Sequence, residues 1–448
     1  MTAANLIPAL VLVSLALLAR RTLGSWLSPG AFFSVFWSVA VWVPLAFAPD
    51  SLVAASGMWW IVASCVSVYV GSAAGVALVG SNPAGSPISR RWPGLRLAIV
   101  GLSIAGFGAA LDVLASRGYS YTVFFSPTSL AHVEREFSVA RYIQGYTEPA
   151  LERYLLACIY LAALLGGLLL ADRRAGRWRW LALLPLLPGG AVAAVETTRS
   201  SIYFPIVLMV CSFLVAQVLV HQSLAALISV KRGLVVGAAT LFVVPLSIWL
   251  QVARYGYSLD NAYQLAEVSS RFRISSFGYL SVFTRWFDIS GMAPRELSLG
   301  TLTFAGLFDA LGIQPRLAGL YAQSVYLGDS GVSSNIYTIF RGLIQDFSPA
   351  GALLFLLVIG MVATVGFVRV QTSDPRFAPI LVAFYAATLW SFIVDIFAYN
   401  TILLAWFAYA LYMLIAHLYY AKAGSNDEEA VQNSSVRTKS DLVRGWTP

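Results

Sequence analysis

Residues 350–368 read AGALLFLLVIGMVATVGFV, a run of nineteen positions without a charged side chain. An α-helix rises about 1.5 Å per residue, so roughly twenty apolar residues cross the hydrocarbon core of a bilayer, which is about 30 Å thick. Because lipid offers no partner to a backbone amide, such a segment must be helical to satisfy its own hydrogen bonds. The run therefore predicts a membrane-spanning helix.

Comparable apolar runs recur along the chain of 448 residues, of which 58% are hydrophobic and only 11% are charged. A soluble domain usually carries about a quarter of charged residues, so this composition indicates the bilayer rather than water. We expect an all-α fold, a polytopic membrane helical bundle of about eleven transmembrane helices. The predicted spans are 3–19, 31–48, 52–79, 97–115, 154–171, 180–195, 202–220, 233–251, 350–368, 378–396 and 400–419. The three cysteines, Cys65, Cys158 and Cys211, fall inside apolar runs and predict buried packing residues rather than a disulfide framework.

Basic residues predict the orientation of these spans. They cluster after every second span, and cytoplasmic loops are the ones that carry an excess of lysine and arginine. The first run has no basic residue before it, which argues against a cleaved signal peptide. We therefore expect the N-terminus outside and the C-terminus in the cytoplasm. The predicted cytoplasmic residues are Arg20, Arg21, Arg90, Arg91, Arg96, Arg173, Arg174, Arg177, Arg179, Lys231, Arg232, Arg369, Arg376, Lys422, Arg437, Lys439 and Arg444.

This reading divides the chain into four parts. Residues 1–252 hold the first eight spans with an outer loop at 116–153, and residues 253–349 form a large outer, periplasmic loop. Apolar residues at 276–287 and 301–312 predict short amphipathic helices in that loop, which would give a folded helical cap. Residues 350–420 hold the last three spans, and the polar tail 421–448 is expected to be disordered in the cytoplasm.

The outer segments carry twelve arginines and no lysine, whereas orientation rules predict few basic residues there. A guanidinium group binds phosphate through paired hydrogen bonds that an ammonium group cannot copy. The alternative reading is a genome that prefers arginine, with ordinary pairing to carboxylates of the loops. A nucleic-acid partner is not expected, because basic residues lie in loops between apolar runs. The twelve are Arg117, Arg135, Arg141, Arg153, Arg199, Arg254, Arg271, Arg273, Arg285, Arg295, Arg316 and Arg341.

Two of these arginines lie at predicted span ends, and two more follow in the large outer loop. Arg199 lies in a turn between two apolar runs, where a charge is costly unless it is paired or faces a watery cavity. Pairing with Glu196 is one reading, and a phosphate or sugar contact is the other. Arg254 directly follows a predicted span, and Arg271 and Arg273 would face one side of an extended segment or diverge on a helix. These three could form an anion-binding cradle or be solvated charges.

The richest motif is GVSSNIYTIFRGLIQDFSPAG, residues 331–351. Ser333, Ser334 or Asn335 could cap a helix that leads into the next span. Tyr337, Arg341 and Gln345 would then fall four residues apart on one face of that helix, opposite its apolar face. The motif predicts an amphipathic helix with a Tyr-Arg-Gln stripe at the mouth of the bundle.

Ser334-Asn335-Ile-Tyr337-Thr338, then Arg341, then Asp346-Phe347 leading into a span, resembles the signature of bacterial O-antigen polymerases, also called oligosaccharide repeat-unit polymerases. The turn Thr198-Arg199-Ser200 is similar to that family's Arg-Ser turn, and a single long outer loop is typical of it. The family often has glycine after Asp-Phe, whereas this chain has Ser348-Pro349.

The resemblance implies a glycosyltransferase of the bacterial plasma (inner) membrane that polymerises polyprenyl-pyrophosphate-linked oligosaccharides into a surface polysaccharide. It also implies membrane lipids and a chain-length-regulating membrane protein as partners, and no cofactor. Positive groups would stabilise the departing pyrophosphate, and a carboxylate would accept a proton from the attacking hydroxyl. No cluster has the spacing of metal ligands, so no metal is predicted. The phosphate-binding candidates are Arg199, Arg254, Arg271, Arg273 and Arg341, the sugar-binding candidates Asn335 and Tyr337, and the catalytic candidates Asp346 and Glu196, with Asp260, Glu267 and His132 as further bases.

Other functions remain open at this stage. An O-antigen ligase, or another glycosyltransferase acting on lipid-linked sugars at the outer face, would have the same architecture. A transporter of lipid-linked sugars would typically carry charges in mid-membrane and show two-fold internal symmetry. The centres of the predicted spans hold almost no charge, which favours chemistry at the surface. A purely structural membrane component is a further alternative.

Overall fold

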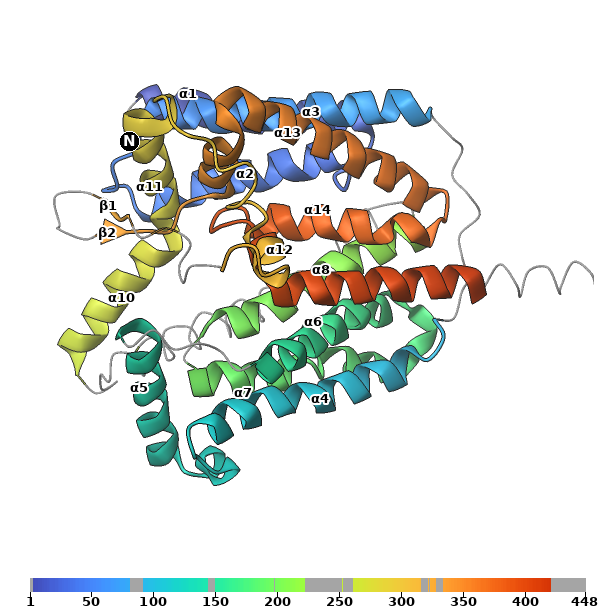
Figure 1. The fold of residues 1–448 in the computed structure, drawn as a ribbon. Helices are drawn as coiled ribbons and strands as arrows, with labels where there is room; N and C mark the ends of the chain where they lie inside the picture. The colour runs from blue at the N-terminus through green and yellow to red at the C-terminus, as the bar shows by residue number, and fades with distance from the viewer. Residues whose placement is uncertain are drawn as a thin grey trace, which may run out of the picture.

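The computed structural model describes residues 3–80, 92–143, 150–196, 198–221, 252, 261–315, 321, 323–327 and 333–419. Within these ranges the chain is nearly all helical, and its long helices lie side by side with their axes roughly parallel (Figure 1). They are α1 (Ala3–Leu23), α2 (Pro29–Phe47), α3 (Ala55–Val79), α4 (Leu95–Ser116), α6 (Ala150–Ala171), α7 (Leu186–Glu196), α8 (Ser200–His221), α13 (Ile339–Gln371), α14 (Ala378–Trp390) and a last helix at Asn400–Tyr419.

Nine helices in the described ranges are long and apolar enough to cross a membrane. The chain is therefore a multi-pass membrane protein, as the sequence predicts. The predicted span at 233–251 lies outside the described residues, and so does the tail 421–448. The predicted span at 378–396 differs from the structure, because α14 ends at Trp390 and the chain continues as a turn and a short 3-10 helix, η6 (Ile396–Ala398).

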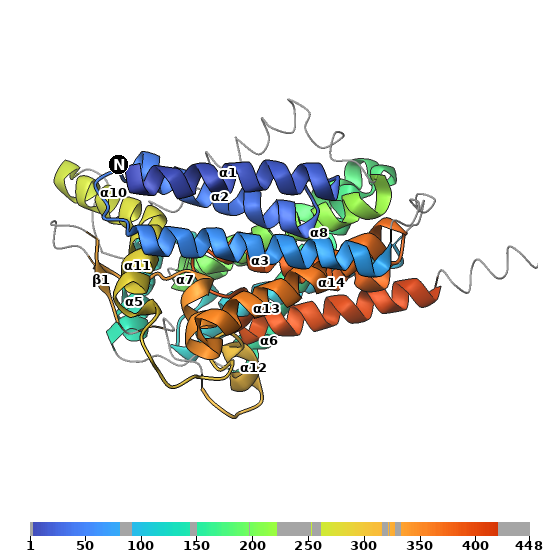
Figure 2. The same ribbon diagram turned by 90° about the horizontal axis from the view of Figure 1, so that it is seen from above.

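The shorter elements gather mainly at one end of the bundle, which we call the cap end. Figures 1 and 2 show α5, α10, α11 and β1 there, across the ends of the long helices. This agrees with the predicted short helices at 276–287 and 301–312. The elements are η1 (Tyr121–Phe125), α5 (Pro127–Ile143), α10 (Ala262–Phe277), α11 (Tyr279–Trp286), η4 (Phe287–Gly291), α12 (Ala305–Ala310), β1 (Val325–Tyr326) and β2 (Ser333–Ser334).

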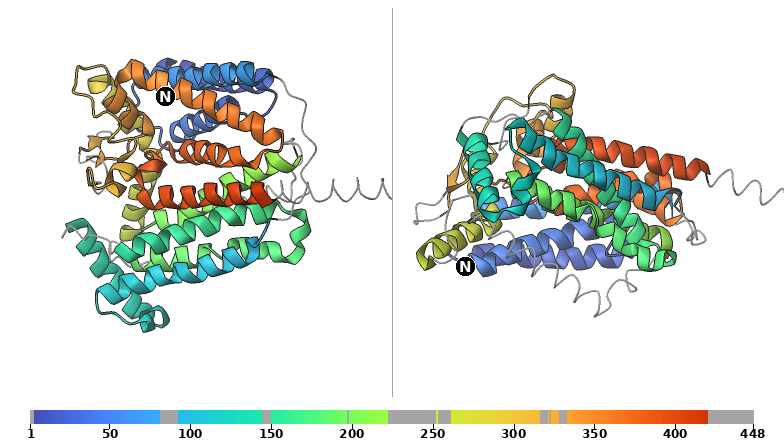
Figure 3. Two further views of the ribbon diagram at one scale, coloured as in Figure 1. Left: turned by 45° about the vertical axis from the view of Figure 1, so that its right-hand side comes forward. Right: turned by 90° about the horizontal axis from the view of Figure 1, so that it is seen from below.

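The opposite end, which we call the basic end, holds the connections that the sequence predicts to be cytoplasmic. Here lie η2 (Arg173–Leu183) and η5 (Pro375–Phe377), and the two views of Figure 3 show them away from the cap elements. The guanidinium of Arg96 at the start of α4 lies 5.5 Å from the Trp178 ring of η2, so two basic connections meet at this end. The clustering matches the alternation of basic residues along the sequence.

Helices α3 and α13 pack backbone against backbone. A Cβ atom on Gly71 would lie 1.9 Å from the carbonyl oxygen of Leu357, and one on Gly360 would lie 2.5 Å from that of Val68. Small residues permit such close approach, which strengthens van der Waals contact between helices in lipid. The contact fixes α13 in the bundle and with it the residues that begin this helix.

Helix α13 has a sharp kink at Ser348, whose φ of +68° is non-helical, and Pro349 follows. Proline removes a helical hydrogen bond and disfavours helical geometry in the residue before it. Residues 339–347 thus form a separate helical segment at the cap end, and the apolar run 350–371 crosses the bundle. The predicted span at 350–368 lies within the second segment, and the break falls at the Ser-Pro pair.

Candidate functional site

The predicted start of the amphipathic helix is wrong. Ser333 and Ser334 form β2, which pairs antiparallel with β1, and the helix begins at Ile339 after the N-cap Thr338. The backbone amide of Ile339 donates to the carbonyl oxygen of Ser391 at 2.8 Å. Short-range capping signals at 333–335 are therefore overridden by strand pairing and by a contact with the end of α14.

Residues before the helix fasten the β1 segment in place. The side-chain amide of Asn335 donates to the carbonyl oxygen of Tyr321 at 3.0 Å, and the Tyr337 hydroxyl donates to that of Gln323 at 3.0 Å. Because both acceptors lie just before β1, these contacts position Tyr321 and Gln323 beside the start of α13. Asn335 and Tyr337, which the sequence predicts to bind sugar, thus each donate a hydrogen bond to a backbone carbonyl just before β1.

Arg341 lies in a cage of three aromatic rings. Its guanidinium carbon is 3.9 Å from the ring centroid of Tyr337, 4.3 Å from that of Tyr321 and 5.1 Å from that of Trp286. The residue is only 5% exposed. A cation over an aromatic face is stabilised by the negative face of the ring, by about 2 kcal/mol when desolvated. The cage accounts for how a buried guanidinium is tolerated here.

The hydrogen-bond partners of Arg341 are neutral. Its Nε donates to Gln345 Oε1 and its Nη2 to Gln323 Oε1, each at 3.3 Å. Nη1 is buried and has no acceptor in hydrogen-bonding geometry within the described part of the chain. No carboxylate there forms an ion pair with Arg341. The site is therefore a buried positive charge that is not neutralised by a described carboxylate and has an unfilled donor.

A second guanidinium lies close to this cage. Arg295 lies 5.3 Å from the centroid of the Trp286 ring, the same indole that Arg341 contacts. It donates through Nη2 to the carbonyl oxygens of Ser290 and Gly291, and its charge and that of Arg341 repel each other. Burial lowers the pKa of Arg295 below its ordinary value. Two positive groups thus contact the same indole ring, and a bound anion would reduce the repulsion between them.

Asp346 contacts backbone amides rather than Arg341. The carboxylate is fully buried and accepts from the amides of Leu302 at 3.2 Å and Thr303 at 2.7 Å. These bonds hold the 298–304 segment, which precedes α12, against the start of α13. The geometry is that of an anchor for this segment, and a role of Asp346 as catalytic base stays a prediction.

Asp395 adds a second buried carboxylate to this region. It accepts from the backbone amide of Phe397 at 3.0 Å and is 5% exposed. Its charge interacts with that of Asp346, and both interact with the Tyr321 hydroxyl. Tyr321 thus interacts both with the guanidinium of Arg341 and with the charges of the two carboxylates.

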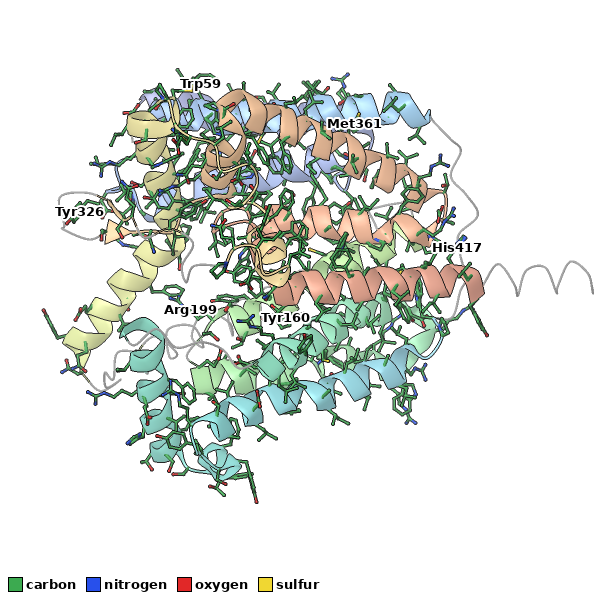
Figure 4. All side chains as sticks on the ribbon, viewed as in Figure 1. Trp59, Tyr160, Arg199, Tyr326, Met361 and His417 are labelled. Carbon is green, nitrogen blue, oxygen red and sulfur yellow. The ribbon has the colours of Figure 1, made fainter. Side chains whose placement is uncertain are left out.

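Arg199 and Glu196 lie in the turn between α7 and α8, at the cap end (Figure 4). Glu196 is 4% exposed and accepts from the Thr198 hydroxyl at 3.3 Å. The Arg199 guanidinium lies 6.0 Å from the Phe272 ring centroid on α10. The structure thus places both residues at the same end as Arg341, and α8 packs against α14.

Aromatic packing links this turn to the cage. Phe204, one turn into α8, lies 4.5 Å from the Trp390 ring centroid at the end of α14. Ser391, the next residue, accepts the amide of Ile339 at the start of α13. Arg199 and Arg341 are therefore held by one continuous set of contacts across the cap end.

The remaining arginine candidates diverge. Arg273 on α10 forms a two-pronged ion pair with Asp50, with nitrogen–oxygen distances of 2.9 and 3.3 Å. Its positive charge is thus already balanced. Arg254 and the side chain of Arg271 lie outside the described residues. The cradle predicted from these three arginines stays a prediction, and Arg273 is its weakest member.

The sequence interpretation named Gln345 in the stripe but missed the rest of the cage. Trp286, Arg295, Tyr321 and Gln323 come from segments 14 to 55 residues earlier in the chain than Arg341 or Tyr337, so no helical spacing connects them with Arg341. The available signal was Trp286 inside a predicted outer helix and Arg295 among the outer arginines. In the described ranges, no three His, Cys, Asp or Glu residues gather as metal ligands would.

Comparisons of the chain with protein-family models, with curated protein sequences and with solved structures found no match.

Proposed function

We propose that this protein is a glycosyltransferase that polymerises polyprenyl-pyrophosphate-linked oligosaccharide repeat units into a surface polysaccharide. In this proposal the cap end faces the periplasm, and the basic end faces the cytoplasm of a bacterium. The observation that carries the proposal is the caged guanidinium of Arg341, buried and, among the described residues, bonded only to neutral acceptors. The likeness of residues 334–347 to the repeat-unit polymerase signature contains that same arginine.

The reaction breaks the bond between the first sugar of the growing chain and a phosphate oxygen of its carrier. A hydroxyl of the next lipid-linked unit forms the new glycosidic bond and loses its proton to a base. Negative charge develops on the departing pyrophosphate, and preorganised positive groups lower the energy of that transition state. Arg341, with Arg295 on the same Trp286 ring, supplies this charge in a buried site, where it acts more strongly than in water.

The neutral partners of Arg341 support this role. A phosphate oxygen carries more charge than the amide oxygen of Gln323, so it would replace that oxygen on Nη2 and also fill Nη1. An arginine already paired with a carboxylate, such as Arg273 with Asp50, would first have to lose that partner. Because its partners are neutral, we propose Arg341 rather than Arg273 as the phosphate contact.

The base in this proposal is a carboxylate of the cap end. Glu196, buried in the turn beside Arg199, accepts from the Thr198 hydroxyl and lies in the second stretch that is similar to the polymerases. Asp346 has both carboxylate oxygens engaged by backbone amides, which is costly to give up. Glu196 and Asp346 are both proposed for proton transfer, and Asp346 would have to give up two backbone hydrogen bonds to act.

Deletion of the gene in its host tests the proposal, with surface glycans separated on a gel. Single-repeat products in place of a ladder are the expected result. Reintroducing the gene with Arg341 intact should restore the ladder. An intact ladder that accumulates on the lipid carrier would instead identify a ligase. Loss of lipid-linked repeat units from the outer face would identify a transporter.

A further inference from the structure

The basic end contains a pocket that the proposed function does not use. Its volume is about 550 Å³, and it lies where the start of α4 meets the end of α6 and η2. Two arginines from different segments line it together with apolar side chains. The lining includes Trp92, Leu95, Arg96, Leu169, Asp172 and Arg174.

The fold of η2 builds one wall of this pocket. The Asp172 carboxylate accepts the backbone amide of Arg174 at 2.9 Å, and Arg179 Nε donates to the Asp172 carbonyl oxygen at 2.9 Å. Gly176 takes a positive φ of 54°, which turns the segment back across the bundle. Asp172 is thus occupied in shaping the turn, and the pocket keeps a net positive lining.

Trp178 separates this pocket from an apolar groove. The guanidinium carbons of Arg96 and Arg177 each lie 5.5 Å from the centroid of its ring. Beyond it a groove of about 430 Å³ is lined by Trp180, Leu181, Leu184 and Leu187. Trp180 is 76% exposed and Leu187 60% exposed, so these apolar groups face whatever surrounds the helices.

We propose that the pocket and the groove together bind one anionic phospholipid. The lipid phosphate would lie in the pocket between Arg96 and Arg174, and an acyl chain would lie along Trp180, Leu184 and Leu187. Basic residues at the end of a membrane helix attract anionic head groups, and tryptophan prefers the interface between head groups and hydrocarbon. A soluble anion would use the pocket alone and leave the apolar groove empty, which is why we assign a lipid.

The test uses the full chain in nanodiscs of phosphatidylcholine with a minor fraction of phosphatidylglycerol. Native mass spectrometry measures how much phosphatidylglycerol stays bound after release from the disc. The pocket variant is Arg96→Gln with Arg174→Gln. The matched control is Arg20→Gln with Arg21→Gln, two arginines of the same end that do not line the pocket.

We expect the pocket variant to retain about 25-fold less phosphatidylglycerol, since each of the two arginines at an anionic surface contributes roughly a fivefold factor. The control should retain as much as the unchanged chain. Equal losses in both variants, or no loss in either, would overturn the proposal. Displacement of the lipid by 10 mM inorganic phosphate would reassign the pocket to a soluble anion and overturn the lipid.

A measurement on the unchanged sequence covers the case in which the pocket variant does not fold. Hydrogen exchange of residues 173–187 is compared in phosphatidylcholine discs with and without phosphatidylglycerol. The anionic lipid should slow exchange in this segment, because it bridges η2 and α4, and leave the cap elements unchanged. Identical exchange in the two discs would contradict the proposal.

Discussion

The guanidinium carbon of Arg341 lies 3.9 Å from the ring centroid of Tyr337, four residues earlier and outside the helix that Arg341 belongs to. Removing a guanidinium from water costs several kcal/mol. Three cation–π contacts of about 2 kcal/mol each and two hydrogen bonds to glutamines offset that cost. Because no described carboxylate neutralises the charge, its field is available to an anion. This combination links the fold of the cap to the proposed chemistry.

Trp286 tests the cage, since its indole contacts both Arg341 and Arg295. Replacing it with leucine should destabilise the protein by roughly 2–4 kcal/mol, through lost packing and lost cation–π contacts. Polymer output should fall about tenfold, and Trp286→Phe should recover most of it. Thermal unfolding in detergent and glycan gels measure the two effects. Trp59→Leu, at a position that is 47% exposed, is the control and should change neither.

Asp346 separates an anchoring role from a catalytic one. Asparagine keeps one carbonyl oxygen, so Asp346→Asn leaves one of the amides of Leu302 and Thr303 without an acceptor. We expect a loss of roughly 1–3 kcal/mol and faster hydrogen exchange at residues 298–304. Lost activity with unchanged exchange in that segment would assign the carboxylate to proton transfer instead.

The contact between α3 and α13 should tolerate no side chain at Gly71. A methyl group there would lie 1.9 Å from the carbonyl oxygen of Leu357, which is backbone and cannot move aside. Gly71→Ala should cost roughly 1–3 kcal/mol or more. Gly101→Ala, with nothing within 4 Å of the new methyl group, should be neutral. Folded yield and melting temperature are measured for both variants. Equal values for Gly71→Ala and Gly101→Ala would argue against this packing of α3 on α13.

The burial of Glu134 predicts that the stability of α5 depends on pH. Burial raises its pKa from 4.5 to about 7, and the side chain is 1% exposed. Between these pH values the folded form holds a proton that the unfolded form has lost, so stability falls as pH rises and stays reduced above pH 7. The helix should be less protected from hydrogen exchange at pH 8 than at pH 5, by roughly 1–3 kcal/mol.

Glu134→Gln should remove this difference, because glutamine has no proton to lose. Glu136 lies two residues further along the chain, and its side chain is 44% exposed, so Glu136→Gln should leave the difference in place. Protection that rises with pH in the unchanged chain would show that Glu134 is not buried in its neutral form.

The sequence predicts the membrane bundle well, because apolar length and the placement of basic residues are local properties of the chain. It also predicts the association of Tyr337, Arg341 and Gln345. Tyr337 nevertheless reaches Arg341 from an extended segment, not from the predicted helix. The grouping is right, and the geometry assumed for it is not.

The rest of the site depends on contacts between distant segments. Ser333 and Ser334 pair with Val325 and Tyr326, so a strand occupies the predicted helix cap. Trp286, Arg295 and Tyr321 reach Arg341 through the folding of the cap, and no periodicity in the sequence reports such contacts. Spacing reveals neighbours on one element, whereas the cage is built from several elements.

Binding of polyprenyl pyrophosphate to the purified full chain tests the central claim most directly, with variants Arg341→Gln and Arg341→Lys compared. If the Arg341 guanidinium binds phosphate through two nitrogens, both variants should lower the affinity about tenfold or more. Lysine keeps the positive charge but cannot form the paired hydrogen bonds. Arg135→Gln, an exposed arginine of α5, should bind as the unchanged chain does. Unchanged affinity in folded Arg341→Gln would contradict the account.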